Sequence, residues 1–156
     1  MATVYKAPEH PDFDDENPSV FLAGSIEMGK AVDWQTELTE GLMDIPDLNI
    51  MNPRRDDWDS SWEQTIENEQ FNEQVSWELE KQEQADVICM YFDKDTQAPI
   101  TLLELGLFCE PEVLIVCCPE GFYRKGNVDI VCQRYGIEQV DTLEELIAVT
   151  RERILE

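Results

Sequence analysis

The chain has 156 residues, a usual size for one domain, and its 42% hydrophobic and 29% charged residues are typical of a globular protein rather than a disordered one. Its charge is unusual, because 11 Lys and Arg against 35 Asp and Glu leave a net charge of −24. A surface this acidic repels phosphate backbones and anionic lipid heads, so we expect neither nucleic acid nor a membrane surface as partner.

The predicted elements follow from apolar runs and their spacing. Residues 1–18 hold several prolines and acids and are expected to form a surface arm, which leaves 19–156 as the single domain. Short apolar runs predict strands at 19–23, 48–51, 87–92, 113–117 and 137–140. Helical patterns lie at 32–43, 62–84, 100–108, 127–134 and from a capping box at Thr142 to about residue 155.

Strands that are apolar on both faces and alternate with helices predict a parallel sheet covered on both sides. We therefore predict an α/β, doubly wound, flavodoxin-like fold with five strands in the order 2-1-3-4-5. In such a sheet the ligand crevice lies beyond the carboxyl ends of the strands, where the order reverses between the first and third. The loops after Ala23 and Phe92 are thus the ones expected to line it.

The cysteines and the histidine limit the chemistry. No apolar run approaches the length of a membrane span and no signal pattern opens the chain, so a cytoplasmic location is expected. The single His10 gives no support for a His-based metal site or a Ser-His-Asp triad, and we predict no metal. An odd number of cysteines without Cys-x-x-Cys spacing predicts reduced thiols in or near the core, at Cys89, Cys109, Cys117, Cys118 and Cys132.

The first crevice loop contains Gly24, Ser25 and Ile26. A strand that opens into small residues before a helix can aim backbone N–H groups at an anion. The loop lacks the Gly-Lys-Ser/Thr ending of a P-loop and the Gly-x-Gly-x-x-Gly of dinucleotide sites. Because Gly-Ser turns also follow strands for structural reasons alone, a ligand contact and a plain turn both remain open here.

The second crevice loop begins at Asp93 and leads to Glu104, which is surrounded in sequence by leucines. A carboxylate at an apolar helix start near the crevice is costly unless it is used or paired. The alternative is a solvated helical Glu.

The second strand ends at Asn52, and Arg54 and Arg55 follow close to the predicted crevice. The two arginines could clamp a phosphate, or they could pair with the acids of residues 56–59, which the acidic composition favours. Trp58 in the same loop could stack on a base or pack as an ordinary lid residue.

Three segments, 21–26, 85–88 and 103–106, resemble in order and spacing the nucleoside 2-deoxyribosyltransferase family and its relatives, the deoxynucleoside 5′-monophosphate N-glycosidases. The resemblance spans about residues 19–140 and implies cleavage or transfer of an N-glycosidic bond. In the family the Glu of Glu-Leu-Gly is the nucleophile, which corresponds to Glu104. A second family acid stands eight residues before the Asp of Ala-Asp-Val, which corresponds to Glu78, where the family enzymes have Asp.

Beyond the acids, one further position departs from the family and another matches it. The transferases have a base-contacting Asp six residues before the nucleophile and the glycosidases tend to have Ser, but this chain has Ala98, which implies altered recognition of the base. The transferases also bring an Asn from a neighbouring subunit into the site, and the matching residue is Asn127. The resemblance thus implies a homo-oligomer, a dimer or larger, and slightly favours transfer over hydrolysis.

The residue types suit this chemistry independently of the family. A carboxylate can stabilise the positive charge that builds on the sugar or form a glycosyl-enzyme, and a second acid can protonate the leaving base. Neither step needs a metal or an organic cofactor. A monophosphate N-glycosidase and a non-catalytic nucleotide-binding module are the alternatives. We predict Glu104 and Glu78 as catalytic residues, and as substrate-binding residues Gly24, Ser25, Ile26, Asn52, Arg55, Trp58, Asp93 and Asn127.

Overall fold

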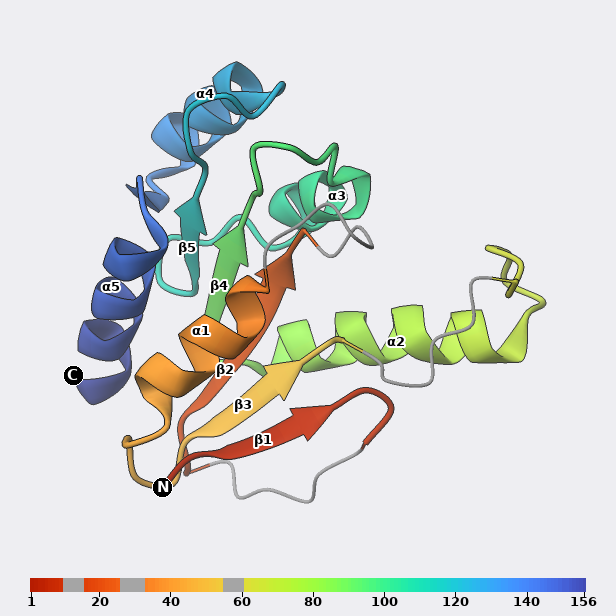
Figure 1. Ribbon diagram of the computed structural model, residues 1–156, viewed down its shortest axis with the longest axis horizontal. Helices are drawn as coiled ribbons and strands as arrows, with labels where there is room; N and C mark the ends of the chain where they lie inside the picture. Colours follow the sequence, from red (N-terminus) through yellow and green to blue (C-terminus); the bar gives the residue numbers. More distant parts are fainter. Residues whose placement is uncertain (10–15, 26–32, 55–60) are drawn as a thin grey trace.

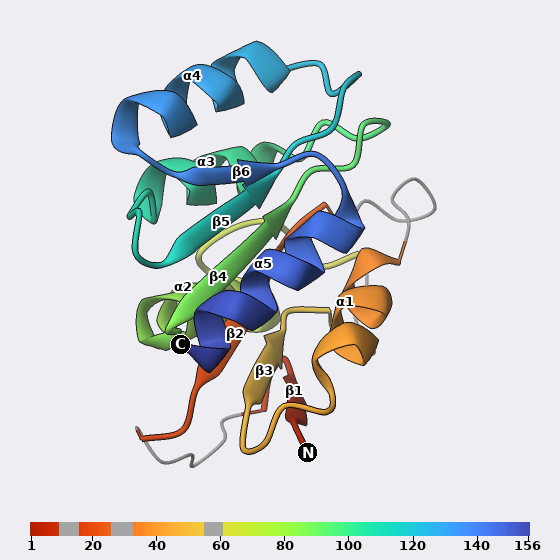
Figure 2. The ribbon, with the colours of Figure 1, turned by 90° about the vertical axis from the view of Figure 1, so that its left-hand side faces the viewer.

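The computed structural model describes residues 1–9, 16–25, 33–54 and 61–156. Its strands form one parallel sheet in the order β1-β3-β2-β4-β5-β6 (Figure 1; β6 is labelled in Figure 2). The strands are β1 (Thr3–Lys6), β2 (Ser19–Gly24), β3 (Asn49–Asn52), β4 (Val87–Tyr91), β5 (Leu114–Cys117) and β6 (Glu138–Val140). The helices are α1 (Trp34–Leu42), α2 (Glu69–Gln84), α3 (Pro99–Leu107), α4 (Lys125–Tyr135) and α5 (Leu143–Leu155).

Helices cover both faces of the sheet, which confirms the doubly wound α/β fold (Figure 2). Alternate residues of each strand point to opposite faces. Val20 and Leu22 therefore pack in a core with Trp34 of α1 and with α5, whereas Phe21 packs with Trp77 of α2 in a second core that also contains residues of α3 and α4. The four interior strands β2, β3, β4 and β5 are buried on both faces, as their apolar runs predicted.

The sheet has six strands where the sequence predicted five. The additional strand, β1, pairs with β3 at the edge of the sheet, with Thr3 opposite Asn49 and Lys6 opposite Asn52. Its four residues are only partly buried, so they lack the continuous apolar run that marks the interior strands. The five predicted strands keep the predicted order, and β1 makes residues 3–6, expected in a surface arm, part of the sheet.

Helix α2 begins at Glu69, later than the predicted residue 62. Asn68 is its N-cap, since the side-chain Oδ1 accepts a hydrogen bond from the Phe71 N–H at 2.9 Å. The buried side chains of the helix are Gln74, Trp77, Lys81 and Gln82. The other residues of α2 are exposed or half-buried, so most of this Glu- and Gln-rich helix is in contact with solvent.

The end of β2 is fastened to β4 and to α1. The Ser25 N–H donates to the Tyr91 carbonyl at 3.0 Å, and the Trp34 indole N–H donates to the Ser25 carbonyl at 2.9 Å. The Trp34 and Tyr91 rings stack with their centroids 5.4 Å apart. Gly24 lies so close to β4 that a Cβ atom there would fall 2.3 Å from the Tyr91 carbonyl oxygen.

All five cysteines are free, and all but the half-buried Cys109 are buried, which confirms the prediction that they lie in or near the core. Burial raises the pKa of the Cys89 thiol to about 12, because it disfavours the thiolate. In the described part of the chain, no helix has both the length and the apolar character needed to cross a membrane.

Candidate active site

Glu104 lies in the second turn of α3 and is 6% exposed. Its Oε2 accepts a hydrogen bond of 2.6 Å from Nε2 of Gln82 on α2. Among the described residues it forms no ion pair with a Lys or an Arg. Burial raises the pKa of Glu104 to about 7, and the hydrogen bond from Gln82 acts in the opposite direction. The carboxyl group is therefore neither solvated nor neutralised by a described cation.

Glu78 lies on α2, and its carboxyl group interacts with that of Glu104. Burial is the main cause that raises the pKa of Glu78 to about 8, the negative charge of Glu104 is the second, and a hydrogen bond from Gln74 lowers it. The fold thus brings the two predicted catalytic acids together from two helices.

Glu78 belongs to a row of polar side chains on α2 that interacts with Glu104. Gln74, Glu78 and Gln82 are spaced four residues apart and so lie on one side of the helix. The Gln74 side chain donates to the Pro53 carbonyl at 2.8 Å, which links the row to the segment that follows β3. Sequence reasoning missed both glutamines; their four-residue spacing about Glu78 is the signal that could have identified them.

Ser25 and Asp93 join the two predicted crevice loops to each other. The Asp93 N–H donates to Ser25 Oγ at 3.0 Å, and Thr96 Oγ1 lies 2.8 Å from Ser25 Oγ and 2.9 Å from the Asp93 carbonyl oxygen. The Asp93 carboxylate accepts from the Asp95 N–H at 2.9 Å. Both residues are buried, so they fix the loop geometry, and contact of Gly24, Ser25 or Asp93 with a ligand stays a prediction.

Asn52 and Arg54 lie beside α1. Asn52 Oδ1 accepts from the Arg54 N–H at 3.0 Å. The Arg54 guanidinium lies 3.4 Å from Gln35 Oε1, to which it donates, and 3.9 Å from the Asp33 carboxylate. Arg54 therefore contacts Asp33 and Gln35 at the start of α1. The acids of residues 56–59, its predicted partners, lie outside the described residues. Three predicted binding residues, Ile26, Arg55 and Trp58, lie outside the described residues.

One comparison with known proteins decides the family. The sequence model described as "Nucleoside 2-deoxyribosyltransferase like" matches residues 17–122, more than half of the chain. The chain belongs to this family. No curated protein matches the chain.

The match of this nucleoside 2-deoxyribosyltransferase-like protein includes Glu78 and Glu104 but ends before α4. Asn127, on the first turn of α4, is exposed and lies beyond the matched segment, so its role stays a prediction. Ala98 falls within the match and is the N-cap of α3, where it is 4% exposed and has a left-handed backbone with φ 45°. A methyl group thus stands where the family enzymes have an acid or a hydroxyl.

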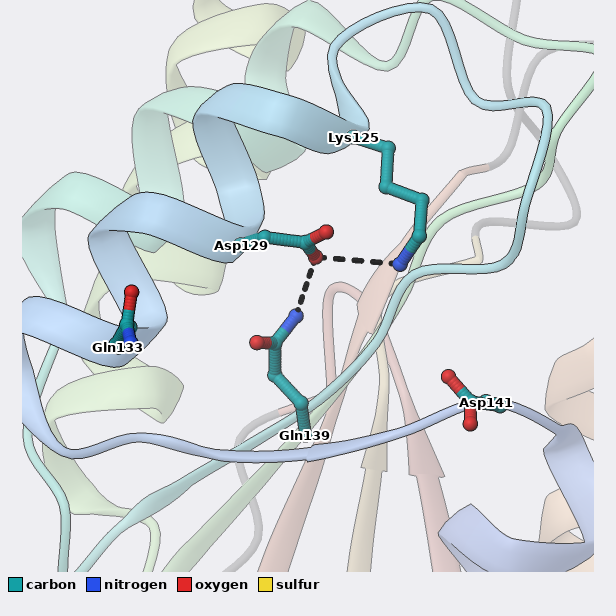
Figure 3. A pocket seen from close by; sticks show the side chains of 5 residues that line it. All are labelled: Lys125, Asp129, Gln133, Gln139 and Asp141. Atoms are coloured by element: carbon teal, nitrogen blue, oxygen red, sulfur yellow. Dashed lines mark hydrogen bonds and ion pairs between the residues drawn. The ribbon is translucent and has the colours of Figure 1, made fainter.

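The nucleoside 2-deoxyribosyltransferase-like chain also has an open groove of about 520 Å³ between α4 and the end of β6 (Figure 3). Lys125 donates to the Asp129 carboxylate at 3.2 Å, and Gln139 donates to the same oxygen at 2.9 Å. With Asp129 beside the lysine and Asp141 also in the lining, the groove is not suited to an anion. Its lining contains no residue of α2 or α3, so it is separate from the Glu78–Glu104 pair. Among the described residues, no cluster of three or more His, Cys, Asp or Glu could hold a metal ion.

Proposed function

We propose that this protein cleaves or transfers the N-glycosidic bond of a (2-deoxy)nucleoside, with Glu104 as nucleophile and Glu78 as acid. Membership of the family supports a nucleoside or nucleotide as the substrate class. The observation that carries the proposal is the interaction between the half-buried Glu78 on α2 and the buried Glu104 on α3, of which Glu104 accepts a hydrogen bond from an amide and pairs with no described cation.

In the proposed first step the Glu104 carboxylate attacks the anomeric carbon. The C–N bond breaks, its electron pair leaves with the base, and the Glu78 proton goes to the base. In the second step a free base or water attacks the glycosyl-enzyme and gives its proton back to Glu78, while Glu104 leaves as a carboxylate. Two displacements retain the configuration at the anomeric carbon. The raised pKa of Glu78 supports this division, because burial in the first place and the charge of Glu104 in the second keep Glu78 protonated.

We expect a bell-shaped dependence of kcat/KM on pH. Glu104 must be ionised, so the rate should rise as pH passes about 7, and Glu78 must be protonated, so the rate should fall as pH passes about 8. The two apparent values belong to the coupled pair. Initial rates measured from about pH 5 to about pH 10 test this. Glu78→Gln should lose the falling limb, and a wild-type profile that is flat across both values would contradict the assignment.

Incubation with a panel of deoxynucleosides and their 5′-monophosphates, with and without a second free base, tests the activity itself. Exchanged nucleoside on chromatography indicates transfer, free base alone indicates hydrolysis, and no product would overturn the proposal in favour of a binding module. The contacts of Arg54 with Gln35 and Asp33 favour the nucleoside over the monophosphate. Exclusive use of monophosphates would instead support the N-glycosidase alternative.

An oligomer is also part of the proposal. Ile100, Leu103 and Leu107 are 60%, 59% and 55% exposed and share one face of α3, a helix whose single charged residue is the buried Glu104. An apolar face is costly to leave in water. Ile130 on α4 is 67% exposed and lies three residues after Asn127, hence on the same side of that helix. These faces suit contact with a second copy that would bring Asn127 to the neighbouring site.

Leu103→Glu should therefore yield a monomer with greatly reduced activity, because it places a charge in the proposed contact. Sedimentation at the assay concentration measures the assembly. Leu155→Glu, on the exposed end of α5, is the matched control and should change neither assembly nor rate. A fully active wild-type monomer would remove the proposal of a shared site.

A further inference from the structure

We propose that Gln82 is a positioning residue, which holds the Glu104 carboxylate in one orientation for attack on the substrate. The inference rests on the proposed function, in which Glu104 is the nucleophile. The family resemblance pointed to Glu78 and Glu104 but assigned nothing to Gln82.

The side-chain amide of Gln82 lies between α2 and Glu104 and donates a hydrogen bond to each. We call this arrangement the Gln82 clamp. The Gln82 side chain is 2% exposed, and its Nε2 donates to Glu104 Oε2 at 2.6 Å and to the Glu78 backbone carbonyl at 3.1 Å. A side-chain amide nitrogen has two protons, so both are used. The bond to the Glu78 carbonyl lies within α2 and fixes the amide, and the amide in turn fixes the carboxylate of α3.

The orientation of the amide follows from the same two partners. A backbone carbonyl can only accept, and so can an ionised carboxylate. If the amide were turned over, Oε1 would face both acceptors and both hydrogen bonds would be lost. In the observed orientation Oε1 is buried with no hydrogen-bond partner among the described residues. A buried acceptor left unpaired destabilises the fold. The observed orientation of the amide thus has a cost in stability, and it directs both N–H donors to acceptors.

The Gln82 clamp also favours one protonation state of Glu104. A donated N–H stabilises the carboxylate over the acid, whereas burial disfavours the carboxylate. Glu78, on α2, is the titratable group that interacts with Glu104 in the described part of the chain, and its charge would add to the penalty. Gln82 is thus the described side chain that opposes burial and keeps the nucleophile ionisable near neutral pH.

Two substitutions with opposite expected effects test the inference. Gln82→Met keeps the length of the side chain but removes the donor, so the pKa of Glu104 should rise, by about one pH unit. Gln82→Lys replaces the amide with a cationic donor, so the same pKa should fall. The readout is an NMR titration of ¹³C-labelled Glu carboxyl groups, in which Glu104→Gln assigns the signal. Gln84→Met, at an exposed position on the same helix, is the control and should leave the pKa unchanged.

Kinetics give a second readout. In Gln82→Met the rising limb of kcat/KM should move to higher pH with the pKa, and kcat near pH 7 should fall about fivefold, as the ionised fraction of Glu104 does, whereas KM should change little. A change of packing alone would lower the rate without moving the rising limb, whereas the loss of a donor should move that limb to higher pH. Thermal unfolding checks that each variant folds; if one variant fails to fold, the direction of the shift in the other decides.

The outcomes separate this inference from the proposed function. The inference would be overturned, and the proposed function left standing, if the wild type is active and the pKa of Glu104 in both Gln82 variants equals that in the wild type. A wild type that turns over no member of the nucleoside panel, but whose Glu104 pKa moves in opposite directions in the two variants, would overturn the proposed function alone. A shift of equal size in Gln84→Met would also overturn the inference.

Discussion

Glu104→Gln should abolish turnover and reduce kcat by about 10⁴-fold or more, the scale on which removal of a covalent nucleophile acts. An amide oxygen cannot attack the anomeric carbon and leave again as a carboxylate does. The substitution keeps the shape of the side chain, and the new amide oxygen can still accept the hydrogen bond from Gln82. The loss should therefore lie in the chemical step and not in the fold.

The measurement combines initial rates on the true substrate with thermal unfolding. The unfolding midpoint should not fall, because the substitution removes a group whose ionisation burial disfavours. Glu112→Gln removes an exposed carboxylate elsewhere on the surface and is the matched control. Wild-type rates in purified Glu104→Gln would show that another group is the nucleophile.

Gly24→Ala should destabilise the protein by about 3 kcal/mol, the upper range for forcing an atom into a packed core. The Cβ atom would meet the Tyr91 carbonyl oxygen at 2.3 Å and Trp34 Cζ2 at 2.6 Å. The first is backbone of the central strand β4, which cannot retreat without disturbing its hydrogen bonds to β2 and β5. Strain at this point also displaces Ser25, whose N–H bonds to the same Tyr91 oxygen.

Urea unfolding at equilibrium gives the difference in free energy. Gly126→Ala is the control, because a Cβ atom there meets nothing within 4 Å and Ala is the better helix former. It should be neutral or slightly stabilising. Equal midpoints for Gly24→Ala and the wild type would mean that β2 and β4 separate easily at this end.

The interior strands were predictable because burial on both faces leaves a continuous apolar run in the sequence, as in 87–92 and 113–117. Strand β1 was not, because an edge strand of four residues is only half covered and needs no such run. The start of α2 depends on the cap at Asn68, a local bond that the helical spacing from residue 62 onward concealed.

For the site, the resemblance pointed to Glu78 and Glu104, and the apolar sequence around Glu104 indicated that its carboxylate was costly. Gln82 could not be distinguished from the other polar residues of a Glu- and Gln-rich helix. Its burial and its hydrogen bond to Glu104 of α3 depend on the tertiary structure, which composition does not encode. Similarly, the buried partners of Ser25 come from residues some seventy positions later in the chain.

Helix α5 has a consequence for how this protein could be divided or recombined. It lies beyond the matched segment 17–122, yet it covers the central strands: Thr150 Oγ1 lies 3.0 Å from Cys89 Sγ, and Arg151 binds Asp44 and the Gly41 carbonyl at 2.6 and 2.9 Å. A chain cut at the limits of the family match would leave that face of the sheet without half of its cover. The segment that folds with a covered sheet is therefore longer than the segment that matches the family, and a boundary for fusion should lie after α5.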